Sequence, residues 1–195
     1  MKNLALFIFL IAAAWKLFVP DSVELGPGVM VDSSPKQQTL AGSDSFVFKD
    51  YQITRLANFD IQAKLLAKEQ YSLGRESDLS PIDFALGWQN MSDESVLKQI
   101  EISQSNRWYH WRVKQFPIPR KEIETQSANM HMIPANDQIE ALLKKVKQGQ
   151  IISISGSLVR VDADDGWHWR SSLTRDDAGA HACEIIYVEH IEINH

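Results

Sequence analysis

The feature that most constrains the fold is a strand pattern near the C-terminus. Across residues 152–158, isoleucine, glycine and leucine occupy one parity and serine occupies the other. Such alternation predicts a β-strand with one buried and one hydrated face. Gly156 lies inside the run and predicts a bulge or a close backbone approach, which would bend the sheet. Residues 167–173 and 183–193 predict two further strands of the same sheet.

An acidic run from Asp162 to Gly166 joins the first two of these strands. A calcium loop of the EF-hand type needs glycine at its sixth position and glutamate at its twelfth. Here glycine comes fifth and Leu173 comes twelfth, so the run does not fit that loop. We interpret it as a hairpin turn with Asp165-Gly166 in the positions that require positive φ.

Apolar periodicity predicts helices beside this sheet. The clearest spans residues 138–147 and has Asn136 as its N-cap. Its core-facing residues are expected to be Ile139, Leu142, Leu143 and Val146. Further helical segments are expected at residues 59–70, 83–86 and 96–100. Additional strands are expected at residues 46–53 and 107–113.

These elements predict an α+β fold: a curved antiparallel sheet or small open β-barrel, with helices packed on one side. The sheet would be built mainly from residues 107–113 and 150–193. The chain has 195 residues, 44% of them apolar, which suits one globular domain, expected at residues 46–195. Its net charge of −5 gives no indication of a nucleic-acid partner.

Residues 1–20 have the composition of an export signal, with a lone lysine before a long apolar run. As a helix, residues 4–19 would span about 24 Å, against roughly 30 Å of hydrocarbon in a bilayer. We expect an uncleaved signal anchor, which places the protein in the inner membrane as a single pass with its domain in the periplasm. The alternative is cleavage after the alanine triplet 12–14, which would leave a secreted or periplasmic protein.

Residues 21–45 contain Pro, Gly, Ser and Gln without a sustained period, which predicts a tether between membrane and domain. The apolar residues Val29, Met30 and Val31 leave a second possibility open. The segment could instead be an extended arm that lies along the domain.

Four segments resemble an uncharacterised family of exported or membrane-anchored bacterial proteins. They are SPIDFALGW, ISQSNRWYHW, SANMHMIPA and GWHWRSSLTRDDAGAHACEIIYVE. The resemblance covers most of the chain from about residue 26 onward. It implies export and brings no known activity, so functional roles must come from the residues themselves.

Cys183 is the single cysteine and the candidate nucleophile, with His131 or His168 as its base. The segment GAHAC partly resembles the cysteine loop of envelope L,D-transpeptidases, which implies a cysteine-dependent hydrolase or transferase. It departs from that loop at Ala182, where the family has glycine, and at Glu184, where the family has a positive charge. The apolar residues that follow Cys183 favour a buried thiol at the start of a strand.

Met130-His131-Met132 could offer soft ligands for Cu(I) together with Cys183. In an extended segment, however, both methionines point to one face and His131 to the other. Copper handling is therefore the third hypothesis. We expect neither a resident metal nor a cofactor.

The candidate ligand-binding set comes mainly from the C-terminal stretch. Trp167 and Trp169 share one face of a strand and suit stacking on a sugar ring or gripping a peptide. Arg175 can bind a carboxylate bidentately, and Asp177 lies beside it. Asn129 completes the set. The leading hypothesis is a membrane-tethered, non-enzymatic envelope module that binds an envelope protein or a cell-wall component.

Overall fold

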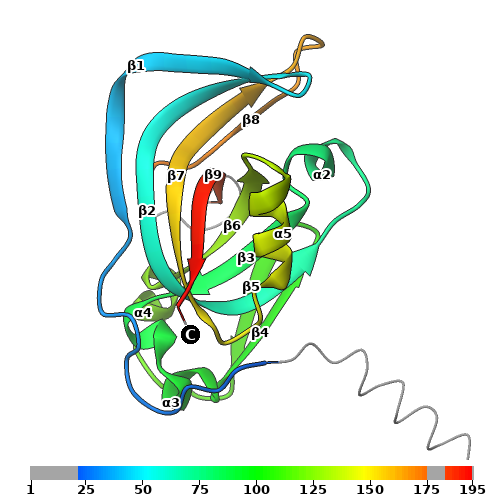
Figure 1. The fold of residues 1–195 in the computed structure, drawn as a ribbon. Helices are drawn as coiled ribbons and strands as arrows, with labels where there is room; N and C mark the ends of the chain where they lie inside the picture. The colour runs from blue at the N-terminus through cyan, green and yellow to red at the C-terminus, as the bar shows by residue number, and fades with distance from the viewer. Residues whose placement is uncertain (1–21, 175–182, 195) are drawn as a thin grey trace, which may run out of the picture.

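The computed structural model describes residues 22–174 and 183–194. Strands account for 51% of the described residues and helices for 17%, so the fold is mostly β. The expected α+β class is wrong, because two segments expected to be helical are strands. The helices that remain are short and do not form a layer of their own (Figure 1).

Seven strands form one large mixed sheet in the order β1-β2-β3-β6-β9-β7-β8. Neighbouring strands are antiparallel except β6 and β9, which are parallel. The expectation of a purely antiparallel sheet is therefore wrong. The strands are β1 (Lys36–Phe48), β2 (Tyr51–Gln70), β3 (Ile82–Gly87), β6 (Ser127–Pro134), β7 (Ile151–Asp162), β8 (His168–Arg170) and β9 (Glu184–Ile193).

The sheet closes on itself through the long strand β2. Residues 52–64 of β2 pair with β7, and residues 64–70 pair with β3. Because β3, β6, β9 and β7 are already joined in that order, the additional pairing completes a ring of five strands. β1 and β8 pair with β2 and β7 outside this ring.

Residues 59–70 belong to β2 and not to the expected helix. Phe59, Ile61, Ala63 and Leu65 are buried at every second position, which is the period of a strand. Positions 61 and 65 also fit helical spacing, so the local pattern was ambiguous, and pairing with distant strands decides it. Residues 83–86, expected as a helical turn, lie in β3, where every residue is buried.

The helix that follows β6 is α5 (Asp137–Lys145). The Asn136 side chain caps it as expected, accepting hydrogen bonds from the backbone N–H groups of Gln138 and Ile139. Ile139, Leu143 and Val146 are buried, but Leu142 is 36% exposed. The expectation that Leu142 faces the core is therefore wrong, because it lies towards the solvent edge of the apolar stripe.

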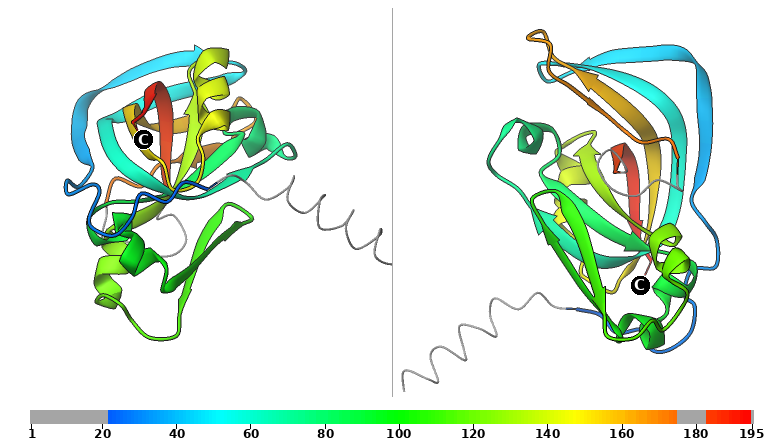
Figure 2. Two further views of the ribbon diagram at one scale, coloured as in Figure 1. Left: turned by 60° about the horizontal axis from the view of Figure 1, so that its bottom comes forward. Right: turned by 180° about the vertical axis from the view of Figure 1, so that it is seen from behind.

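A second, two-stranded sheet connects β3 to β6. It is a hairpin of β4 (Ile100–Ser105) and β5 (Trp108–Val113), which confirms the strand expected at residues 107–113 but places it outside the large sheet. The expected helix at residues 96–100 is shorter, because Ile100 begins β4. The connecting helices are η1 (Gln89–Ser92), α3 (Glu94–Leu97) and α4 (Arg120–Thr125). In Figure 2 the hairpin lies beside the five-stranded ring, with α3 and α4 close to one of its ends.

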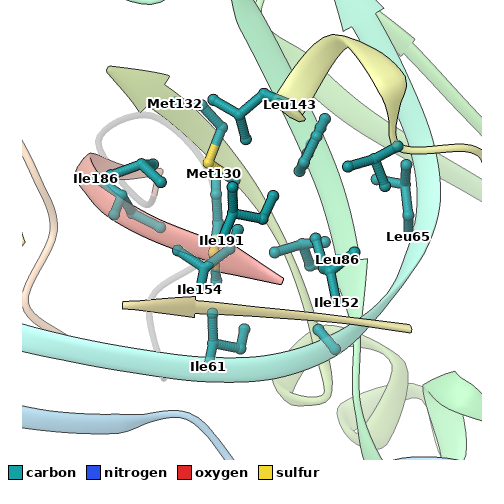
Figure 3. Packing of buried hydrophobic residues seen from close by; sticks show 14 of the residues in the cluster. Ile61, Leu65, Leu86, Met130, Met132, Leu143, Ile152, Ile154, Ile186 and Ile191 are labelled. Carbon is teal, nitrogen blue, oxygen red and sulfur yellow. The ribbon is translucent and has the colours of Figure 1, made fainter. Parts of the chain in front are cut away.

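The main hydrophobic core fills the interior of the ring. Side chains from all five of its strands and from α5 converge there (Figure 3). Among them are Ile61, Leu65, Leu86, Met130, Met132, Leu143, Ile152, Ile154, Ile186 and Ile191. Each strand thus buries one face inside the ring, which leaves the outer faces of β3 and β6 for other contacts.

Two expectations at the C-terminal strands are confirmed. The register of β7 on β9 shifts between Ser155 and Gly156, and a Cβ at Gly156 would lie 2.0 Å from a backbone oxygen of Tyr187. A hairpin turn joins β7 to β8, and Gly166 has the positive φ of 90°. Asp165 does not share that conformation; its carboxylate instead accepts a hydrogen bond from the Trp167 N–H.

Residues 22–35 lie along the domain as an extended arm, and the rest of the expected tether forms most of β1. Val31 is buried in the main core, and its N–H donates to the Ser92 hydroxyl. The Val23 N–H donates to the Gln148 carbonyl, so contact with the domain begins at the first described residues. None of the helices in segments 22–174 and 183–194 is long and apolar enough to cross a membrane.

Candidate functional site

A buried cluster of charged residues lies on the outer face of β3 and β6. Asp83 on β3 is fully buried, and its Oδ1 accepts a hydrogen bond of 2.7 Å from Arg107 Nη1. The same guanidinium nitrogen donates to the Ser80 carbonyl at 2.8 Å. Among the described residues, Asp83 Oδ2 has no hydrogen-bond partner. A buried carboxylate of this kind is stabilised by its cation, so Arg107 is held in one place.

His131 on β6 is the third member of this cluster and is almost fully buried. Its Nδ1 lies 2.9 Å from Asp83 Oδ1, at an angle that does not make a hydrogen bond. Its ring packs against Trp169, with ring centroids 4.8 Å apart. Asp83 on one side and Trp169 on the other thus fix the position of the imidazole.

Arg107 is presented by a strained turn. Asn106 and Arg107 form the two-residue loop of the β4–β5 hairpin, and both have positive φ, 52° and 69°. A two-residue hairpin loop of this type normally has glycine at its second position, because side chains disfavour the left-handed region. Here the strain is offset by backbone contacts: the Arg107 N–H donates to the Tyr71 hydroxyl and its carbonyl accepts from Asn129 Nδ2.

A cavity of about 830 Å³ opens beside this cluster. We call it the basic cavity, because the side chains that line it include Arg107, Arg160, Arg170, His131, His168 and Trp169. Glu76 is the one acidic side chain among the described residues that line it. Asp162 pairs with Arg160, whereas Arg170 has no carboxylate partner in the described part of the chain.

A second cavity of about 620 Å³ lies beside the β4–β5 hairpin and α4. We call it the aromatic cavity, because Trp88, Trp108, Tyr109, Trp111 and Phe116 line it. Burial raises the pKa of Tyr109 to about 12, and its hydroxyl donates to Ser127 Oγ. The charged residues among its described lining are Arg112, Arg120, Glu124 and Glu184.

Trp108 and Cys183 line both cavities, so the two adjoin. Of the residues expected from the sequence, Cys183, His131, His168 and Trp169 all line the basic cavity. Asn129 lines the aromatic cavity instead, where its Oδ1 accepts a hydrogen bond of 2.6 Å from Gln104 Nε2.

One expected binding residue, Trp167, lies outside both cavities. Trp167 packs against Tyr51 and the Arg75 guanidinium, outside the two cavities. Arg175 and Asp177 lie outside the residues that the structure describes.

The two methionines proposed as copper ligands are core residues. Met130 and Met132 are fully buried inside the ring, while His131 faces the basic cavity on the other side of β6. This is the arrangement expected from strand geometry. Within residues 22–174 and 183–194, no group of three or more His, Cys, Asp or Glu side chains is placed to hold a metal ion.

The five-stranded ring has the connectivity of an OB-fold. In chain order its strands are β2, β3, β6, β7 and β9, the ring order is first-second-third-fifth-fourth, and α5 joins the third to the fourth. This architecture binds ligands on the face of its second and third strands, between the first-second and fourth-fifth connections. The basic cavity lies at that position: His131 comes from β6, Glu76 from the first connection and residues 168–173 from the other.

No family model, curated protein sequence or solved structure matches this chain. The functional interpretation therefore rests on the geometry of the two cavities.

The residues that sequence reasoning missed are Asp83 and Arg107. The sequence does contain a signal for Arg107: Asn106-Arg107 stands between two alternating strands, where Asn-Gly is the usual pair. A bulky residue with positive φ at such a turn indicates a function for its side chain.

Proposed function

We propose that the protein is a membrane-tethered, non-enzymatic binding module of the bacterial envelope, and that it binds the anionic group of its ligand in the basic cavity. The observation that carries this proposal is that Arg170 and the anchored Arg107 line the same cavity, where Arg170 has no carboxylate partner among the described residues. The apolar N-terminal run and the resemblance to exported proteins support the location.

Arg107 suits recognition of an anion because part of its guanidinium is free. Both of its side-chain hydrogen bonds with described residues use Nη1, so Nη2 and Nε have no partner in that part of the chain. The guanidinium carbon lies 3.9 Å from the centroid of Tyr71, so the group is stacked as well as paired. A guanidinium fixed in this way binds a carboxylate or phosphate with little loss of side-chain entropy.

A cysteine-dependent hydrolase or transferase remains the second candidate, because cysteine, histidine and a carboxylate often occur together in nucleophilic sites, and Cys183, His131 and Asp83 are residues of these types. Cys183 and His131 line the same cavity, and Asp83 lies against His131. Two features count against this reading. Arg107 already occupies Asp83 Oδ1, and the approach of His131 to that oxygen does not form an orienting hydrogen bond.

The binding function is tested by titrating the ¹⁵N-labelled full-length protein with inorganic phosphate at constant ionic strength. We expect the Nε–Hε resonances of Arg107 and Arg170 to shift together and to saturate. Arg170→Ala should weaken phosphate binding about tenfold, the value of one charge-assisted hydrogen bond. Arg112→Ala removes the same charge from the neighbouring cavity and should change nothing. Absence of a saturable shift at both arginines would refute the anion site.

A further inference from the structure

We infer that the ligand is a short saccharide with one acidic group, whose acid lies in the basic cavity and whose neutral rings lie in the aromatic cavity. The inference rests on the proposed anion site and adds the chemical class of the ligand. It follows from the contrast between the two adjoining cavities.

The aromatic cavity has the surface that a carbohydrate ring requires. Trp108 is 42% exposed and lines both cavities, so its indole is accessible to a ligand in either of them. Trp111 and Phe116 form an edge-to-face pair in the same cavity. Sugar rings pack their C–H faces on aromatic rings and direct hydroxyls to polar neighbours. Thr125 supplies such a neighbour, because its hydroxyl donates to the Lys121 carbonyl and its oxygen can still accept a hydrogen bond.

The two cavities differ in the groups that they offer to an anion. In the basic cavity, Arg107 and Arg160 pair with Asp83 and Asp162, and Arg170 has no carboxylate partner among the described residues. In the aromatic cavity, Arg120 pairs with Glu124, and most of the described side chains that line it are aromatic or neutral. The acidic group is therefore assigned to Arg170 and the fixed guanidinium of Arg107.

A single-stranded nucleic acid fits less well, although it also combines rings with negative charge. It carries a phosphate at every nucleotide, so a strand that spans both cavities would place one beside Glu124 or Glu184. The net charge of −5 also gives no electrostatic attraction for a polyanion. A peptide strand cannot add to β3 or β6, because both strands already have neighbours on each side.

The volumes also fit a short oligosaccharide. Each cavity, at about 830 and 620 Å³, falls within the range of roughly 300 to 1,000 Å³ that is usual for small-ligand sites. Because they meet at Trp108 and Cys183, a disaccharide can occupy both.

The test compares two disaccharides that differ by one carboxylate. N-acetylglucosaminyl-N-acetylmuramic acid carries a lactyl carboxylate, and N,N′-diacetylchitobiose has the same two N-acetylated rings without the lactyl group. Binding is measured by calorimetry on the full-length protein in a polyoxyethylene detergent, which contains no sugar. We expect the acidic disaccharide to bind at least about tenfold more tightly.

Two variants test which cavity binds the acidic group and which binds the sugar rings. Arg170→Ala should remove the difference between the two disaccharides, and Trp108→Ala should weaken both to the same degree. Their matched controls, Arg75→Ala and Trp167→Ala, lie outside both cavities and should retain the difference. Circular dichroism of all four variants checks that each is folded.

Three results would overturn the inference. Equal affinity for the two disaccharides, with phosphate binding intact, would refute the acidic saccharide but keep the anion site. Tighter binding of oligothymidylate than of either sugar would assign the groove to nucleic acid. Failure to bind phosphate as well as both sugars would refute the proposed function itself.

Discussion

Replacement of Arg107 by alanine is expected to destabilise the domain by about 3 kcal/mol. Asp83 is fully buried, and Arg107 Nη1 contacts its carboxylate at 2.7 Å. Removing one partner of a buried ion pair costs about 3 to 5 kcal/mol, because the other charge stays buried and uncompensated. The lower value applies here because the Arg107 side chain is 19% exposed, so water can enter the space that it leaves beside Asp83.

Glycine at the same position separates the ion pair from the backbone strain. Arg107 has a φ of 69°, a conformation that costs residues with a Cβ about 1 to 2 kcal/mol relative to glycine. The free energy of unfolding of Arg107→Gly should therefore be about 1 kcal/mol higher than that of Arg107→Ala, although both variants lose the same ion pair. With Asp83→Asn already present, Arg107→Ala should cost less than about 1 kcal/mol, because no buried charge is left behind.

Urea unfolding of the wild-type protein, the two Arg107 variants, Asp83→Asn and the double variant, followed by circular dichroism, gives these free energies. Arg112→Ala, an exposed arginine on the same hairpin, serves as the control and should change stability by less than about 0.5 kcal/mol. A loss below about 1 kcal/mol for Arg107→Ala in the native background would show that Asp83 does not depend on this cation. The account of a fixed guanidinium at the cavity would then be wrong.

Three further predictions address the fold. Leu143→Ala should cost about 2 to 5 kcal/mol of stability because Leu143 is fully buried, whereas Leu142→Ala should cost under about 1 kcal/mol. Equal losses in urea unfolding would contradict the described buried face of α5. Gly156→Ala should cost more than about 2 kcal/mol, since its Cβ would lie 2.0 Å from a backbone oxygen, whereas Gly42→Ala meets nothing within 4 Å and should leave the melting temperature nearly unchanged. The pKa of Tyr109 is raised from 10.0 to about 12, so the folded state binds this proton more tightly than the unfolded state does. Roughly 3 kcal/mol of folding stability that is present below pH 10 should therefore be lost between about pH 10 and 12. Tyr109→Phe should remove that part of the alkaline decline, and an unchanged pH profile would show that burial of this hydroxyl has no such effect.

Features set by one or two residues could be predicted from the sequence. The Asn136 cap, the bulge at Gly156 and the turn at Gly166 depend on local backbone chemistry, and the structure confirms each. The opposite facing of His131 and its flanking methionines follows from strand geometry alone, and it too is confirmed.

Features set by long-range pairing could not be predicted. Residues 59–70 satisfy both a strand period and part of a helical one, and only pairing with β7 and β3 decides between them. Asp83 and Arg107 are 24 positions apart and meet because the β4–β5 hairpin folds back over β3. No local sequence pattern indicates that contact, so the ion pair at the centre of the candidate site could not be predicted without the fold.

Protection of Cys183 from alkylation tests the central claim most directly. This thiol is the only one in the chain and lines both cavities, so its reaction with N-ethylmaleimide reports on the joined site alone. With the acidic disaccharide at saturation, we expect the rate to fall at least about tenfold, the ratio that follows from occupancy above about 90%. N,N′-diacetylchitobiose at the same concentration should protect far less. A fast reaction that the disaccharide leaves unchanged, and that His131→Ala suppresses, would contradict the binding module and favour a cysteine-dependent enzyme.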